Sequence, residues 1–212
     1  MRILTMVFVT IFLSGCYQAQ IYQTRPDAVA GINIYTVDGG KIPGNWAYIV
    51  DDSVKTASRQ IKASSHVCSL HTYPVDATEA LSTSIGHAMN NLFENAFPRS
   101  STPSEEMVSK EKLSGTVIVK LDEFYPKFNC SVGPVEGYCS ATTDISLTAL
   151  VIDYKKKKQR YAHANAQRSS DGGGGHMCDG ASKVIAESVK RATKEVLERL
   201  AEKISFLTSA DK

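Results

Sequence analysis

Apolar and polar residues alternate along three consecutive segments in the second half of the chain. The segments cover residues 113–125, 140–154 and 159–168, and in each one apolar or small residues recur mainly at every second position. A period of two is typical of β-strands that bury one face and expose the other. Residues 45–51 and 54–63 are weaker strand candidates. We therefore expect three sequential antiparallel strands, preceded by two further strands.

A spacing of three and four residues predicts two helices. The first begins after Asp76, where Asp76 and Glu79 have the form of a capping box, and Pro98 is expected to end it. The second runs from Ala181 to about Leu207. The apolar stripes comprise Leu81, Ile85, Ala88, Met89, Leu92, Phe93 and Ala96 in the first helix, and Ile185, Val189, Ala192, Val196, Leu200 and Ile204 in the second. We expect both stripes to pack on a core; contact with a membrane or a partner is the alternative for the first.

These elements predict an α+β fold in which one antiparallel sheet packs against two helices in two layers. The domain is expected to cover residues 45–212, a length that can bury a substantial core. Residues 16–44 are polar and contain several proline and glycine residues, so we expect a tether that carries at most a short strand at residues 31–37. Residues 99–112 have the composition of a solvated connector.

The amino terminus differs from the rest of the chain. Arg2 precedes an apolar run at residues 3–13, which is shorter than the ~20 residues that a membrane-spanning helix requires. Its length and charge fit a secretory signal peptide at residues 1–15. The run ends in the sequence LSGC, residues 13–16, which resembles the lipobox of bacterial lipoproteins. That resemblance implies cleavage before Cys16 and attachment of a diacylglycerol and an N-acyl chain to this cysteine; the alternative is an ordinary signal peptide with an incidental cysteine.

The lipoprotein resemblance also implies where the protein resides. Three acyl chains would make the membrane anchor effectively permanent. The cysteine is followed by Tyr17, not by the aspartate that resembles an inner-membrane retention signal in enteric bacteria. We therefore expect a lipid anchor in the outer membrane with the chain facing the periplasm; the inner membrane is the alternative. No cofactor other than the covalent acyl chains is expected.

Charge and motifs argue against several classes of function. Basic and acidic residues number 24 and 22, a net charge of +2, which gives no electrostatic reason to expect a nucleic-acid partner. The sequence has no G-x-S-x-G or H-E-x-x-H motif, and neighbouring strand residues such as Asp122 and Glu123 face opposite ways. Four lysines at residues 155–158 fit a solvated hairpin tip better than an anion-binding patch. We therefore expect no enzymatic activity.

Apart from Cys16, the chain has four cysteines, an even number that suits disulfides in an oxidising compartment. Four cysteines permit three pairings. The spacing favours Cys130 with Cys139, because they flank a Gly-Pro turn region between two predicted strands, and Cys68 with Cys178 then follows by elimination. The second bridge would close the longer loop and stabilise the fold more.

Histidines close to two of these cysteines offer an alternative. His66 and His71 flank Cys68, and His176 lies two residues before Cys178. Imidazole and thiolate are good zinc or copper ligands, so these five residues would form a His/Cys metal site if the thiols were reduced. Their spacing matches no zinc signature well, and periplasmic thiols tend to be oxidised. Two disulfides and no metal are therefore the primary expectation, and the metal site remains the alternative.

The order of elements resembles that of several small outer-membrane accessory lipoproteins. These are the lipopolysaccharide-assembly lipoprotein, the ABC-transporter auxiliary lipoproteins and the periplasmic activators of peptidoglycan synthases. The resemblance covers most of residues 45–207 and implies a two-layer α+β domain that works by protein contact. We therefore expect a non-catalytic accessory or assembly subunit of a cell-envelope complex; a ligand- or metal-binding lipoprotein and an envelope hydrolase are the alternatives. The pattern leaves the oligomeric state open.

Overall fold

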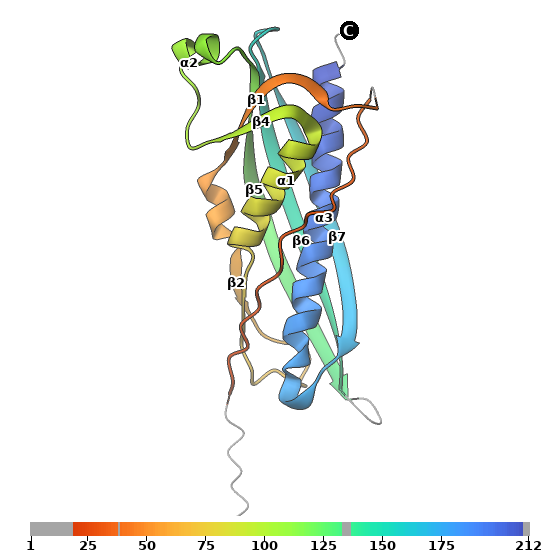
Figure 1. The fold of residues 1–212 in the computed structure, drawn as a ribbon. Helices are drawn as coiled ribbons and strands as arrows, with labels where there is room; N and C mark the ends of the chain where they lie inside the picture. Colours follow the sequence, from red (N-terminus) through yellow and green to blue (C-terminus); the bar gives the residue numbers. More distant parts are fainter. Residues whose placement is uncertain (1–18, 38, 133–136, 210–212) are drawn as a thin grey trace, which may run out of the picture.

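Five strands form a mixed sheet at the centre of the fold (Figure 1). The computed structural model describes residues 19–37, 39–132 and 137–209; the predicted signal peptide and the lipidation site at Cys16 lie outside these residues. The strands are β1 (Ile42–Val50), β4 (Phe93–Arg99), β5 (Leu113–Val132), β6 (Gly137–Asp153) and β7 (Lys158–Gly173), in the spatial order β4-β1-β5-β6-β7. The antiparallel pairs β5–β6 and β6–β7 confirm the predicted meander.

The expectation of a purely antiparallel sheet is wrong at one edge. β1 runs parallel to both β4 and β5. Parallel neighbours need long crossover connections. Here α1 (Thr78–Leu92) lies between β1 and β4 in the sequence, and α2 (Glu105–Lys110) lies between β4 and β5. The fold therefore combines helices with a mixed sheet.

Two helices pack on one face of this sheet (Figure 1). α3 (Gly180–Ser209) lies along β6 and β7, and α1 packs beside α3 and against β4. The predicted stripes are buried, as the complete burial of Leu92 and Leu200 illustrates, except at Ala96, which is half-buried and lies in β4. Gly115 in β5 leaves room for the ring of Trp46, with which any larger side chain would collide. None of the described helices is both long and apolar enough to span a membrane.

The first helix ends earlier than predicted. α1 stops at Leu92, well before Pro98, because Phe93 is already extended and begins β4. Pro98 lies in this edge strand, where its missing N–H needs no strand partner. No side chain caps the helix at its N-cap; Asp76 instead accepts a hydrogen bond from the Thr78 amide (3.1 Å). The apolar spacing of the helix continues to Phe93 and Ala96, but these residues pair with β1 as part of β4 and are not helical.

A separate small sheet and a short helix lie outside the central layers. β2 (Ser58–Ile61) and β3 (Tyr73–Asp76) pair antiparallel. The predicted strand at residues 54–63 is shorter than expected, because Asp52–Thr56 form a 3-10 helix, η1. α2 lies within the predicted connector, and the Ser104 side chain caps its N-terminus. The described part of the chain therefore has three α-helices, not two.

Much of the expected tether packs on the domain. Val29 and Ile32 are buried, and the Val29 amide donates a hydrogen bond to the Ser84 hydroxyl in α1 (2.8 Å). No strand forms at residues 31–37. A few widely spaced apolar residues carry this packing within a polar segment, which explains why the composition predicts a free tether.

Candidate functional site

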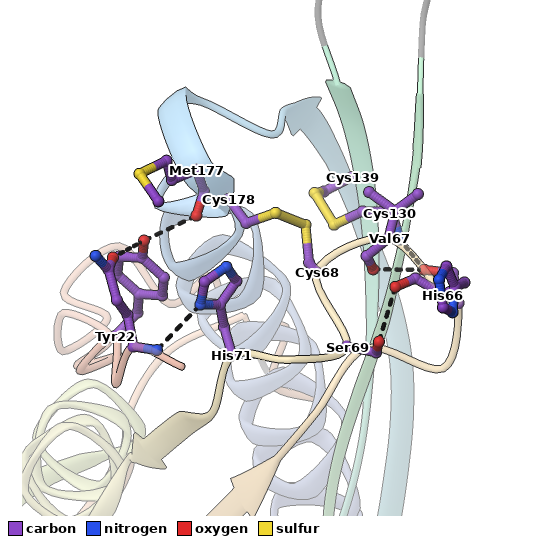
Figure 2. The surroundings of a disulfide bond; sticks show 12 residues. Tyr22, His66, Val67, Cys68, Ser69, His71, Cys130, Cys139, Met177 and Cys178 are labelled. Carbon is purple, nitrogen blue, oxygen red and sulfur yellow. Dashed lines mark hydrogen bonds between the residues drawn. A yellow bond between two sulfur atoms is a disulfide. The ribbon is translucent and has the colours of Figure 1, made fainter. Parts of the chain in front are cut away.

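Two disulfides lie side by side at one end of the sheet, far from the carboxy-terminal end of α3 (Figures 1 and 2). Cys68 is bonded to Cys178, and Cys130 to Cys139, which is the pairing that the spacing favours. Cys130 and Cys139 are direct partners in the β5–β6 ladder. The other bridge joins the loop before β3 to η2 (His176–Cys178), at the start of α3. The sulfur atoms of Cys68, Cys130 and Cys139 lie within 4.8 Å of one another.

The predicted His/Cys cluster does not present the expected metal ligands. One disulfide joins Cys68 to Cys178, so neither offers a thiolate. His71 is buried, and its Nδ1 accepts a hydrogen bond from the backbone amide of Gln20 (3.1 Å). His66 and His176 are exposed on separate segments. Among the described residues, the only group of three or more potential ligands close enough to share a metal consists of disulfide sulfurs.

We expect no free thiol in the mature chain purified from membranes. The two disulfides use four cysteines, and the predicted acylation blocks the fifth. The measurement is a thiol titration of the denatured, unreduced chain, with elemental analysis for zinc and copper on the same sample. Two reactive thiols per chain together with a stoichiometric metal would contradict the disulfides and restore the metal alternative.

Two tyrosine hydroxyls hold the loops around the Cys68–Cys178 bridge. The Tyr22 hydroxyl donates to the carbonyl of Met177 and the Tyr73 hydroxyl to that of Cys178, both at 2.8 Å, and the two rings stack with centroids 5.4 Å apart. Cys68, Met177 and Cys178 have φ angles of 64°, 50° and 72°, which side-chain-bearing residues rarely adopt. The hydrogen bonds and the bridge together maintain these conformations. Below, "the disulfide end" means the two disulfides with residues 20–24, 62–72 and 176–178.

Replacing Tyr73 with phenylalanine should lower the free energy of unfolding at neutral pH. The same variant should lose less stability than the parent when the pH is raised into the alkaline range. The hydrogen bond to Cys178 would be lost, at a cost of about 1 kcal/mol. Burial, with Tyr22 and Asp179 nearby, raises the pKa of Tyr73 above its ordinary value of 10.0. As the pH rises, the Tyr73 hydroxyl therefore ionises in the unfolded chain before it does so in the folded one. The contribution of Tyr73 to stability is complete below about pH 10 and is lost as the pH rises further. Urea unfolding of both chains at neutral and alkaline pH measures the two effects; an unchanged alkaline loss in Tyr73→Phe would contradict this role.

A second polar cluster lies on the face of the sheet opposite the helices. It comprises Asp122 in β5, Ser146 and Thr148 in β6, and His163 in β7. His163 Nδ1 lies 3.1 Å from the Thr148 hydroxyl and 3.3 Å from an oxygen of Asp122. Its Nε2 lies 3.5 Å from the Ser146 hydroxyl. The β5–β6 register shifts at Asp122, a bulge of the kind that redirects a side chain. Sequence spacing does not reveal this cluster, because its members meet through strand register.

Comparisons with known proteins assign a fold but no family. Neither a protein-family model nor a curated protein matches the sequence. The structure of a Xanthomonas campestris protein described by the family model DUF330 has a TM-score of 0.53 at 11% identity, over 90% of this chain and 99% of that one. The chain is also similar to a minor lipoprotein from Acinetobacter baumannii, with a TM-score of 0.28 at 10% identity over 81% of this chain and 94% of that one. For lipoprotein GNA1162 from Neisseria meningitidis, the TM-score is 0.26 at 10% identity over 70% of this chain and 96% of that one. Of these three, the Xanthomonas structure shows the shared fold, and the other two scores are too low to support an argument.

Proposed function

We propose that the protein is an outer-membrane-anchored periplasmic lipoprotein that acts as a non-catalytic accessory or assembly subunit of a cell-envelope complex. The observation that carries the proposal is the LSGC sequence at the end of a short apolar leader. Disulfides persist in oxidising compartments such as the periplasm, so the two bridges support export. A lipid anchor on the exported chain would hold the α+β domain at a membrane surface.

The outward face of the sheet supports a role in protein contact. α1 and α3 pack on one face, whereas a cross-strand row on the other joins Ile49, Ile118, Leu150 and Tyr161. Ile118 and Leu150 are half-buried, Tyr161 is exposed, and these three lie outside the buried core. Contiguous apolar and aromatic residues on a surface are typical of sites that bind other proteins.

Affinity purification from detergent-solubilised envelopes tests this proposal. The full chain carries its own leader and a tag after Lys212, and the test variant is Tyr161→Asp. Tyr125→Asp is the matched control, because it alters another exposed tyrosine on the same sheet face, about 20 Å away along the strands. We expect an envelope protein to be recovered in fixed ratio with the parent and the control, and about tenfold less with Tyr161→Asp. Recovery of the chain alone, or equal recovery with both variants, would count against the proposal.

The contacts among Asp122, His163 and Ser146 favour a second candidate function, hydrolysis with Ser146 as the nucleophile, although only 8% of this residue is exposed. A serine, imidazole and carboxylate array can activate a nucleophile. Acyl transfer also needs hydrogen-bond donors for the oxyanion. β6 has a strand on each side, so the backbone N–H groups around Ser146 point along the sheet and not toward a substrate above it. This geometry favours the accessory role over hydrolysis.

We expect a fluorophosphonate probe to leave Ser146 unmodified. The Ser146 hydroxyl lies 3.5 Å from His163 Nε2, which is long for a hydrogen bond. The backbone N–H groups beside Ser146 point along the sheet, toward the neighbouring strands. The intact mass of the chain after incubation with the probe is the measurement, with Ser146→Ala as the control. A mass increase in the parent that is absent from Ser146→Ala would contradict the non-catalytic role and support the second candidate.

A further inference from the structure

Five exposed apolar side chains lie close to the two disulfides in the sequence or in strand pairing. Four of them lie within two residues of a disulfide cysteine, and the fifth forms a bridge to Thr72. They are Leu70, Val132, Tyr138, Met177 and Ile21, and they are between 43% and 80% exposed. A surface of this kind marks contact with another protein or with a membrane.

The amino-terminal segment leaves the domain at the same end. Backbone hydrogen bonds fix it from Gln20 onward: the Gln20 carbonyl accepts from the Thr72 amide (3.0 Å), and the Tyr22 amide donates to the Thr72 carbonyl (2.9 Å). Gln20 is four residues from Cys16, a span of at most about 14 Å even in a fully extended chain. A lipid on Cys16 would therefore keep the disulfide end close to the membrane that holds the lipid.

We propose that the disulfide end docks on the bilayer that carries the lipid of Cys16. In this arrangement the five exposed apolar side chains enter the boundary between the headgroups and the acyl chains. Tyrosine is enriched at that boundary, and aliphatic side chains are stabilised by leaving water there. The docking rests on the proposed acylation of Cys16, since the short span to Gln20 is what selects a membrane over a protein partner.

The charges at this end favour apolar insertion over electrostatic attraction. Apart from histidine, residues 20–24, 62–72, 127–139 and 169–180 carry two lysines, Lys62 and Lys127, and three acidic residues, Glu136, Asp171 and Asp179. These segments therefore have no excess of positive charge to attract anionic headgroups. We expect docking to be insensitive to salt, because screening weakens only the interactions between charges.

The opposite end of the molecule provides a matched control. Phe206 is 62% exposed near the end of α3, a helix of 30 residues. Such a helix is about 45 Å long. A docked disulfide end would hold Phe206 away from the bilayer, whereas a domain lying on its side would bring both ends to it.

Tryptophan fluorescence of the acylated full-length protein tests the orientation. Leu70→Trp and Phe206→Trp are introduced separately, and the native Trp46, which is buried, gives the same background in both. Each protein is reconstituted into vesicles of phosphatidylethanolamine and phosphatidylglycerol, with and without brominated acyl chains. We expect bromination to reduce the added emission of Leu70→Trp by about half or more. The emission of Phe206→Trp and of the parent should not change, at low or high salt.

The possible failures are distinguishable. Intact mass shows whether Cys16 is acylated, and an unmodified Cys16 would overturn the proposed function together with the docking. In an acylated chain, an unquenched Leu70→Trp, or equal quenching of Leu70→Trp and Phe206→Trp, would overturn the docking alone. Met177→Trp is the second variant at this end and gives the same test if Leu70→Trp does not fold.

Discussion

Replacing Cys68 and Cys178 with serine should lower the free energy of unfolding by about 5 kcal/mol, which is comparable to the whole stability of a marginal domain. This bridge has a sequence separation of 110 residues, so its loss greatly increases the conformational freedom of the unfolded chain in the chain-entropy account. The loop before β3 would also be released from the start of α3. Urea unfolding of the mature chain, followed by circular dichroism, measures the change.

The matched control replaces both Cys130 and Cys139 with serine. This bridge has a sequence separation of only 9 residues, and its loss should cost about 3 kcal/mol in the same account. The two variants should therefore differ by about 2 kcal/mol. Equal losses, or a larger loss in the control, would contradict the role of the Cys68–Cys178 bridge as the main covalent constraint.

Removing the lipidation site should transfer the protein from the membrane to the soluble periplasmic fraction. The variant carries Cys16→Ser behind a leader that an ordinary signal peptidase cleaves, because an uncleaved leader would itself hold the chain in the membrane. Without acyl chains the disulfide end offers only a few apolar side chains, and even one myristoyl chain gives only marginal binding. We expect the membrane-bound share to fall at least about tenfold.

Fractionation of cells by centrifugation, with immunodetection in each fraction, measures this transfer. The parent chain with its own leader is the control and should remain in the membrane after a salt wash. If Cys16→Ser also remained there after the wash, the lipid would not be the anchor.

Periodicity predicted the longest elements well. Strands such as β5 and β6 bury one face over many residues, so alternation accumulates along them, and α3 repeats its apolar stripe over 30 residues. The parallel pairing of β1 with β4 has no such local signature, because it joins residues on either side of α1. The same pairing makes Phe93 begin a strand although its spacing continues the helical stripe.

The candidate site was predictable where covalent chemistry limits the choices. Four cysteines allow few pairings, and a short loop between strands favours Cys130 with Cys139. The packing of Val29 and Ile32 could not be inferred, because two isolated apolar residues in a polar segment resemble a tether. The contact between Ser146 and His163 depends on the register of two strands, which single-strand spacing does not determine.

The intact mass of the chain extracted from membranes tests the central claim most directly. That claim is that Cys16 is the acylated first residue of the mature protein. We predict the mass of residues 16–212 with two disulfides, a diacylglycerol and an N-acyl chain. An unmodified Cys16, a chain that begins at another residue, or one that retains residues 1–15 would contradict the claim.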